Sequence, residues 1–277
     1  MPVMTQWQAV VTDLDGTVVG PGDAISPATL NAAAQLRYRG VPLIAATART
    51  RNGVERLTAL VGHLAVAVCH NGALGWSPAE SRTLWQRTLP ADDLRDLAGF
   101  VRALPGAGLA VFGVASWDIT PEYLALRGRP PAEPWRPVAL GEIADQPAYG
   151  VAIRHGTLTS DQLTARLTEA GFAERVTLTY SAPHLVEAGP PAVDKAAGVA
   201  SALDWLGIAP EHTVAFGDMP NDLSMFALVG HSVAVGDAHP AVLAAATARA
   251  PFDGFADHLT RLGLISGRTS HPPRAGG

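Results

Sequence analysis

The residues best suited to chemistry in this chain are two aspartates that directly follow a short apolar run. The run Trp7–Thr12 ends at Asp13, and Asp15 follows two residues later, ahead of Gly16 and Thr17. Carboxylates are costly to bury without a compensating charge, so two of them at a strand end indicate a hard cation, a nucleophile or both. A pair of turn-forming aspartates is the alternative interpretation.

Polar residues also follow later apolar runs, at the points where further strands should end. The clusters are 47–49 after the run 41–46, 71–72 after the run 66–69, and 217–222 after the run 213–216. In an open parallel sheet, ligands bind beyond the carboxyl ends of the strands. We therefore expect these clusters to converge on one cleft.

The elements that must position these clusters form an alternating pattern of strands and helices. The apolar runs are continuous rather than alternating, which is typical of strands covered on both faces in a parallel sheet. Ser26 and Pro27 mark a helix start, and Gly40 marks its end. Other expected elements are helices over 194–206, 222–229 and 240–248 and a strand over 231–235. The prediction is an α/β fold with a doubly wound, Rossmann-like parallel-sheet core.

The middle of the chain alternates more loosely, as in a small α+β module. Expected there are helices over 90–104 and 160–170, strands over 108–115, 148–154 and 175–181, and a proline-rich link over 129–137. The predicted domains are a discontinuous core over 1–81 and 189–265, an inserted α+β domain over 82–188 and a disordered tail over 266–277.

Composition excludes several classes of function. The net charge of −5 and the scattered Lys and Arg residues give no electrostatic footprint for nucleic acid or an anionic membrane. No apolar run reaches the roughly 18 residues of a membrane-spanning helix. The single cysteine, Cys69, excludes a disulfide within the chain and fits a reducing cytoplasm. Its apolar neighbours favour a small buried core residue over a nucleophile.

Four motifs in order along the chain resemble those of the haloacid dehalogenase (HAD) superfamily. They are Asp13-Leu14-Asp15-Gly16-Thr17, Thr47, Lys195 and Gly217-Asp218-Met219-Pro220-Asn221-Asp222. The insertion between the second and third motifs, together with Asn71-Gly72, resembles the Cof-type sugar-phosphatase branch, in which the inserted domain is a cap that selects the substrate. The resemblance covers the core, about residues 1–80 and 190–265.

The resemblance implies a role for each catalytic residue. Asp13 would attack phosphorus and form an aspartyl-phosphate intermediate. Asp15 would protonate the leaving oxygen and later deprotonate the attacking water. Lys195 would neutralise the phosphate and the nucleophile.

The resemblance also implies a Mg²⁺ cofactor. Its ligands would be the side chains of Asp13 and Asp218 and the backbone carbonyl of Asp15, with Asp222 as a further candidate. Asn221 and Asp222 lie at an expected helix start. There they could instead hold a metal-bound water, orient the lysine or cap the helix.

The expected residues for binding the phosphate or the rest of the substrate are Thr47, Ala48, Arg49, Asn71, Lys195 and Asn221. The family usually has glycine at the position of Ala48, and alanine can serve there if its φ stays negative. Arg49 as a surface or helix-start residue and Asn71 as a loop cap are open alternatives. Candidates in the inserted domain are Trp117, Asp118, Tyr123, Arg127, Tyr180, His184 and Glu187, with structural roles in that domain as the alternative.

Together these features predict a Mg²⁺-dependent phosphatase of the cytoplasm, a monomer or homodimer with no nucleic-acid or membrane partner. Its substrate would be a small organic phosphomonoester, a sugar phosphate above all. One alternative is a phosphotransferase or phosphomutase that uses the same aspartyl-phosphate. Another is a non-catalytic protein that binds phosphate esters.

Overall fold

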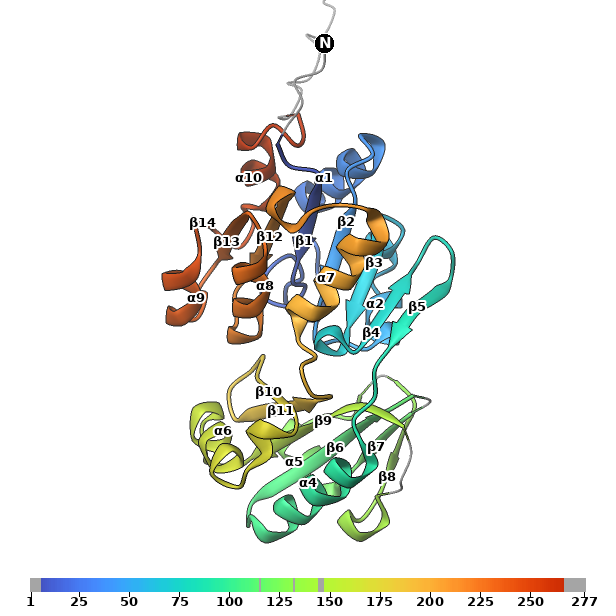
Figure 1. Ribbon diagram of the computed structural model, residues 1–277, viewed down its shortest axis with the longest axis vertical. Coiled ribbons are helices and arrows are strands. Elements are labelled where there is room, and N and C mark those ends of the chain that lie inside the picture. Colours follow the sequence, from blue (N-terminus) through green and yellow to red (C-terminus); the bar gives the residue numbers. More distant parts are fainter. Residues whose placement is uncertain (1–5, 115, 132, 144–146, 267–277) are drawn as a thin grey trace, which may run out of the picture.

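The computed structural model describes residues 6–114, 116–131, 133–143 and 147–266 and contains two sheets, one above the other (Figure 1). The chain leaves the first sheet after β5 (Arg82–Gln86) and returns to it after β11 (Leu185–Gly189). The cap, as the term is used below, is residues 87–189, and the rest is the core. The cap was predicted to start at residue 82. It starts five residues later in the structure, because β5 pairs antiparallel with β4 (Leu74–Ser77) and so belongs to the core sheet. Apart from Ser266, the predicted tail lies outside the described residues.

The core sheet explains why polar clusters meet at one edge. Among the described residues it has eight strands, in the order β14-β13-β12-β1-β2-β3-β4-β5. Strands from β14 to β3 run parallel, and β4 and β5 extend the sheet antiparallel. The other bounds are β1 Ala9–Thr12, β2 Leu43–Ala46, β3 Leu64–Cys69, β12 Thr213–Gly217, β13 His231–Val235 and β14 Ala248–Ala250. The predicted α/β core is confirmed.

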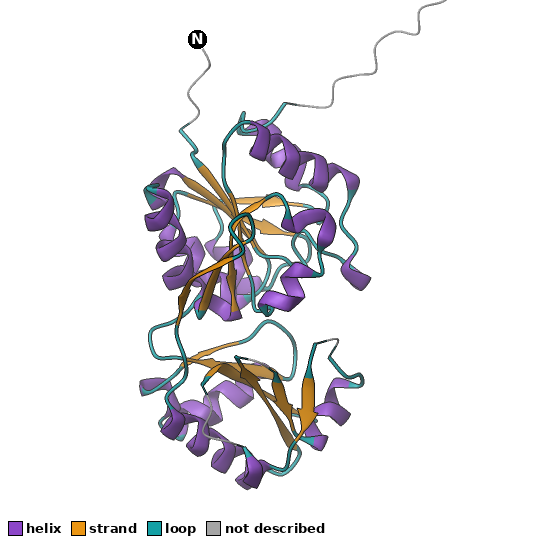
Figure 2. Ribbon diagram, turned by 90° about the vertical axis from the view of Figure 1, so that its right-hand side faces the viewer, coloured by secondary structure: helices purple, strands orange, loops and turns teal. Residues whose placement is uncertain are grey.

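Helices cover both faces of this sheet (Figure 2). They are α1 Pro27–Tyr38, α2 Arg51–Glu55, α3 Thr58–Val61, α7 Lys195–Leu206, α8 Leu223–Leu228, α9 Pro240–Ala245 and α10 Phe255–Arg261. Neighbouring residues of β1 therefore enter different hydrophobic clusters, with Val10 in one and Val11 in the other. Cys69 is buried, as predicted. No helix in the described part of the chain has the length and apolar character needed to cross a membrane.

The predicted helix over 240–248 is wrong at its end. Helix α9 ends at Ala245, and Ala248–Ala250 forms β14 at the sheet edge. The Thr247 hydroxyl accepts a hydrogen bond from the Ser232 amide (2.8 Å) and donates one to the Ser232 carbonyl (2.7 Å). These bonds attach Thr247 to the neighbouring strand and replace those that a longer helix would make.

The cap is an α+β unit, whose sheet has the order β10-β11-β9-β6-β7-β8 in the described residues. Its strands are β6 Ala107–Gly113, β7 Trp117–Ile119, β8 Trp135–Pro137, β9 Ala148–His155, β10 Thr177–Thr179 and β11, and its helices are α4 Ala91–Ala103, α5 Pro121–Arg127 and α6 Ser160–Glu169. Val151 and Ile153 pack with residues of α4 and α6, on the side away from the core (Figure 1). Ala152 and Arg154 therefore face the core, because side chains alternate along a strand.

Six short 3-10 helices complete the described elements, at Pro21–Asp23, His70–Gly72, Leu140–Glu142, Phe172–Glu174, Pro210–His212 and Pro220–Asp222. Two of them lie after core strands at the edge that faces the cap: His70–Gly72 directly follows β3, and Pro220–Asp222 is separated from β12 by Asp218 and Met219. They turn the chain sharply at the strand ends, which brings the polar motif residues to that edge.

Candidate active site

The core edge and the cap enclose a cleft of about 480 Å³. On the core side its lining includes Asp13 and Asp15 after β1, Thr47 and Arg49 after β2, and Asn221 after β12. The strand ends thus converge as the parallel pattern predicts. The far wall of the cleft comes from cap residues, so a bound molecule would contact both units.

Lys195 lies beside Asp13 and Asp222 at this edge and is the only lysine of the chain. It is the first residue of α7, where the Asp194 side chain accepts a hydrogen bond from the Ala197 amide and caps the helix. Its Nζ lies 2.9 Å from Asp13 Oδ1 and 2.6 Å from Asp222 Oδ1, and its side chain has no exposed surface. Burial alone would lower the pKa of Lys195, but the two carboxylates raise it above its ordinary value. The ammonium is therefore held in its charged form.

Asp13, the predicted nucleophile, is buried beside this ammonium. Burial raises its pKa well above the ordinary value, the charges of Asp222 and Asp218 raise it further, and Lys195 opposes them. A second positive charge would complete the neutralisation of these carboxylates.

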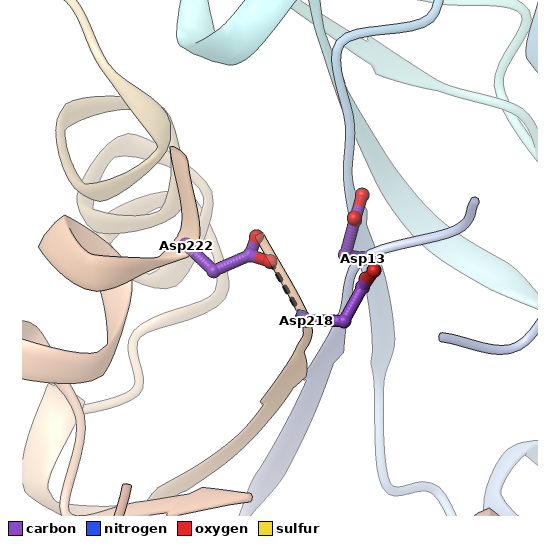
Figure 3. Close-up of side chains that lie close together, drawn as sticks. All are labelled: Asp13, Asp218 and Asp222. Atoms are coloured by element: carbon purple, nitrogen blue, oxygen red, sulfur yellow. Dashed lines mark hydrogen bonds between the residues drawn. The ribbon is translucent and has the colours of Figure 1, made fainter. Parts of the chain in front are cut away.

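Asp13, Asp218 and Asp222 each offer one oxygen to a group whose oxygens lie within 4.8 Å of one another (Figure 3). Burial raises the pKa of Asp218 to about 6, despite the opposing hydrogen bond that Thr17 Oγ1 donates to it at 2.7 Å. Asn221 Oδ1 is buried at the same place with no hydrogen-bond partner among the described residues. Crowded carboxylates and a spare oxygen acceptor are the donor set that suits Mg²⁺.

Asp222 has partners for both of its oxygens. Oδ1 accepts from Lys195, and Oδ2 accepts from the backbone amides of Asp218 (2.9 Å) and Met219 (3.0 Å). Figure 3 shows its bond to the Asp218 amide. Of the roles open to it from the sequence, this geometry favours orienting Lys195 and the loop that carries Asp218.

Gly16 makes room for the approach of Asp218 to the first motif. Its φ is +81°, and a Cβ there would lie 2.3 Å from Asp218 Oδ2. The glycine in Asp13-Leu14-Asp15-Gly16-Thr17 is therefore needed both for its backbone conformation and for the closeness of the carboxylate.

The predicted phosphate loop after β2 is ordered by its own side chains. Thr47 Oγ1 accepts from the Arg49 amide at 3.1 Å, and Ala48 is not among the residues with positive φ, which meets the condition for alanine here. The Arg49 guanidinium donates to both oxygens of Asp15 (2.7 and 2.6 Å) and to Asp23 (2.7 Å). In the structure Arg49 therefore binds two carboxylates, those of Asp15 and Asp23. The contact with Asp23 was not expected from the sequence.

Asn71 connects the core to the cap. Its backbone has a φ of +50°, its Nδ2 donates to Glu187 at 3.2 Å, and its Oδ1 accepts from Asn221 at 3.1 Å. Glu187 also accepts from Ser181 at 3.1 Å. Burial raises the pKa of Glu187 above its ordinary value, while Asn71 and Ser181 oppose this.

Four of the seven predicted cap candidates line the cleft: Trp117, Tyr123, Arg127 and Glu187. The others do not line it, and each has a structural contact. Asp118 is buried and bonded to Arg136 (2.8 Å), Tyr180 donates to Asp161 (2.6 Å), and His184 Nδ1 lies 2.7 Å from the Leu158 carbonyl. Three further charged residues of the cap line the cleft and were not predicted from the sequence: Arg129, Glu133 and Arg154. Alternation along 148–154 was the available signal for Arg154.

Comparisons with known proteins identify the family of this chain. The family model of the haloacid dehalogenase-like hydrolases matches residues 10–253. The HMP-PP phosphatase of Escherichia coli O157:H7 is 28% identical over 233 residues, covering 82% of this chain and 84% of that protein. An uncharacterized hydrolase of Schizosaccharomyces pombe is 26% identical over 268 residues, covering 90% of this chain and 87% of the relative.

Solved structures share the fold. A HAD subclass IIB sugar phosphatase superposes with a TM-score of 0.78 at 20% identity, covering 93% of this chain and all of the other. A haloacid dehalogenase-like hydrolase from B. subtilis gives 0.80 at 22% identity, with the same coverage.

The predicted superfamily is therefore confirmed, and the phosphatase relatives support the phosphoric monoester hydrolase class. The match spans most of the chain and includes both the core motifs and the cap. On this evidence the chain belongs to the haloacid dehalogenase-like hydrolases.

Proposed function

We propose that this protein is a Mg²⁺-dependent phosphatase that hydrolyses a small organic phosphomonoester, with a sugar phosphate as the expected substrate. The observation that carries the proposal is the buried Asp13, 2.9 Å from Lys195 in a cleft that also contains Asp15. The names of the phosphatase relatives support the substrate class.

The residues present fit the two half-reactions of phosphoryl transfer. An oxygen of Asp13 attacks phosphorus as the bond to the ester oxygen breaks, and Asp15 gives that oxygen its proton. Asp15 then takes a proton from the water that attacks the aspartyl-phosphate, which releases inorganic phosphate and restores Asp13. Throughout, the Lys195 ammonium offsets negative charge on the phosphoryl oxygens.

The side chains of Asp13 and Asp218 and the carbonyl of Asp15 would hold Mg²⁺. Bound there, the ion would supply the positive charge that lets an anionic phosphate approach a carboxylate. Asp222 holds Lys195 in place, and Asn221 offers its unpartnered oxygen to the same region.

The test is release of inorganic phosphate from a panel of sugar phosphates, with Mg²⁺ and with EDTA. Asp13→Asn should lower kcat by at least about a thousandfold, because the amide oxygen is a poor nucleophile. The exposed loop residue Asp253 provides the matched control Asp253→Asn, which should keep full activity. Activity that survives both EDTA and Asp13→Asn would contradict the proposal, and a product with a moved phosphate would identify a phosphotransferase.

A further inference from the structure

Three arginines of the cap line the cleft from the side opposite the catalytic carboxylates. Arg127 is the last residue of α5, Arg129 follows in the next loop, and Arg154 lies on β9. Arg154 shares its strand face with Ala152, which lines the same cleft. The sequence thus brings three positive charges onto one wall from separate elements.

These arginines lack the carboxylate partners that other arginines of the protein have, and Arg154 instead lies over the ring of Tyr123, with its Cζ 5.8 Å from the ring centroid. Arg49, Arg136 and Arg175 each form an ion pair with at least one aspartate. By contrast, no carboxylate oxygen of the described residues lies within 4.0 Å of a guanidinium nitrogen of the three cleft arginines. Arg127 donates to the carbonyl of Arg129, at 2.6 Å, rather than to a carboxylate.

One nitrogen in this group is buried without an acceptor. Nε of Arg154 is inaccessible to solvent and has no hydrogen-bond partner among the described residues. An unsatisfied buried donor is costly, and more so on a charged group. A ligand in the cleft that anchors the guanidinium would offset this cost.

The positive charges also act on one another. Burial is the main cause of a lowered pKa for Arg127, and the charges of Arg129 and Arg154 lower it further, against opposing contributions from Tyr123 and Glu133. An anion bound between these guanidinium groups would relieve their mutual repulsion.

The two carboxylates of the same wall are engaged elsewhere. Glu133 accepts from the Thr50 hydroxyl of the core at 2.5 Å. Glu187 accepts from Asn71 and Ser181. Neither is within ion-pair distance of the three arginines, so the wall keeps an excess of positive charge that faces the cleft.

We propose that the cap binds a second anionic group of the substrate, a carboxylate or a further phosphate, with Arg127 and Arg154 as the specificity-determining residues. This rests on the proposed phosphatase function. The transferred phosphate belongs beside Asp13 and Lys195 on the core, so the second anion lies on the part of the substrate that leaves with Asp15's proton. Guanidinium groups suit such a ligand, because they bind carboxylate and phosphate oxygens in pairs.

The experiment compares matched esters that differ in one anionic group. The pairs are glycerol 3-phosphate with 3-phosphoglycerate, and fructose 6-phosphate with fructose 1,6-bisphosphate. The first pair adds a carboxylate and the second adds a phosphate, which separates the two sources of charge. In at least one pair, kcat/KM should be at least about tenfold higher for the ester with the extra anion, as a charge-assisted contact gives.

Variants assign the preference to the arginines. Arg154→Gln and Arg127→Gln should each remove most of it by raising KM for the anionic ester, with less than about a twofold change for its neutral partner. Arg154→Lys keeps the charge but loses the paired donors. Its preference for the anionic ester should therefore lie between that of the unmodified protein and that of Arg154→Gln. Arg166→Gln, at an exposed site on α6 outside the cleft, is the matched control and should change nothing.

The outcomes separate the two proposals. If no ester of the panel and no p-nitrophenyl phosphate is hydrolysed, the phosphatase function fails, and the anion site fails with it. If neutral esters are hydrolysed as well as anionic ones, or if the Arg127 and Arg154 variants leave the ratio unchanged, the anion site alone is overturned.

Discussion

At the scale of single residues, the contact between Asp15 and Arg49 decides how the proposed acid is presented. The Asp15 side chain is 58% exposed, and both of its oxygens accept from one guanidinium that also bonds Asp23. A bidentate pair fixes the direction of a carboxylate more firmly than a single bond does. In the proposed mechanism Arg49 would therefore act on the leaving group through Asp15, whereas contact with phosphate was the role expected from the sequence.

We expect Arg49→Gln to impair the acid rather than phosphate binding. For alkyl phosphates such as glycerol 3-phosphate, whose leaving oxygen needs a proton, kcat should fall about tenfold or more. For p-nitrophenyl phosphate it should change little, since nitrophenolate leaves without one. Initial rates with the two esters, under the same conditions, measure the difference.

Arg51→Gln is the matched control, because Arg51 pairs with Glu55 at 2.9 Å and does not line the cleft. It should leave both rates near those of the unmodified protein. An equal loss of rate with the two esters in Arg49→Gln would return Arg49 to the phosphate-binding role that its sequence position suggested.

At the scale of elements, the seating of α7 on the loop after β3 positions Lys195. A Cβ on Gly198 would lie 2.3 Å from Val68 Cγ1 and 2.7 Å from Gly72 Cα, and a Cβ on Gly72 would lie 2.1 Å from the Asp194 carbonyl. The helix and the loop therefore touch backbone to backbone. Gly198 lies outside all of the motifs, and Gly72 is part of the Asn71-Gly72 pair that follows β3.

Gly198→Ala should destabilise the protein by about 2 kcal/mol, the usual cost of overpacking, and should lower kcat by displacing Lys195. Gly99→Ala is the opposite case, because Gly99 lies inside α4 and a Cβ added there would have no neighbour within 4 Å. It should stabilise by about 0.5–1 kcal/mol through helix propensity. Urea unfolding measures the change in stability, and steady-state rates measure the change in kcat. If Gly198→Ala changed neither, the close packing of α7 on the loop after β3 would be contradicted.

Helices and strands were predicted correctly where a local sequence signal marks their ends. They were missed where the pairing of one strand with another determines the structure. Ser26, Pro27 and Gly40 bracket a helix that the structure places at Pro27–Tyr38, with Ser26 as its cap. The hairpin of β4 and β5 was missed, because its residues join the sheet antiparallel after a parallel series. The bond from Thr50 to Glu133 spans 83 positions, and no local pattern predicts such a partner.

At the scale of the whole molecule, most buried apolar residues of the core and of the cap form separate clusters, although Tyr149 of the cap joins the core cluster and stacks on His70. Polar bonds also connect the two units across the cleft. Thr50 holds Glu133, and Asn71 holds Glu187. Motif order along the chain was enough to predict the core and the presence of an inserted unit. The identity of the residues that face the core from the cap depended on strand register, which the sequence does not specify.

Glu187 makes the stability of this junction depend on pH. Because burial raises its folded-state pKa above the ordinary 4.5, the unfolded chain loses this proton first as the pH rises. The contribution of Glu187 to the free energy of unfolding is thus fully present below pH 4.5 and is lost as the pH rises through the raised value. Glu187→Gln removes that loss, so its stability relative to the unmodified protein should increase with pH.

Denaturant unfolding at several pH values, from about 4 to about 8, measures this difference. The exposed Glu174, for which Glu174→Gln is the control, should show no such trend. A difference between Glu187→Gln and the unmodified protein that stays constant, or that shrinks as the pH rises, would argue against a buried carboxylate at this junction.

The position of Lys195 has a practical consequence for chemical labelling. Since this residue is the only lysine and is fully buried, a reagent that acylates primary amines has, apart from the α-amino group, no other amine to modify. Each lysine acylated would record one opening of the region around α7. The rate at which the protein gains mass would therefore report the rate of that opening, at the residue on which the proposed chemistry depends.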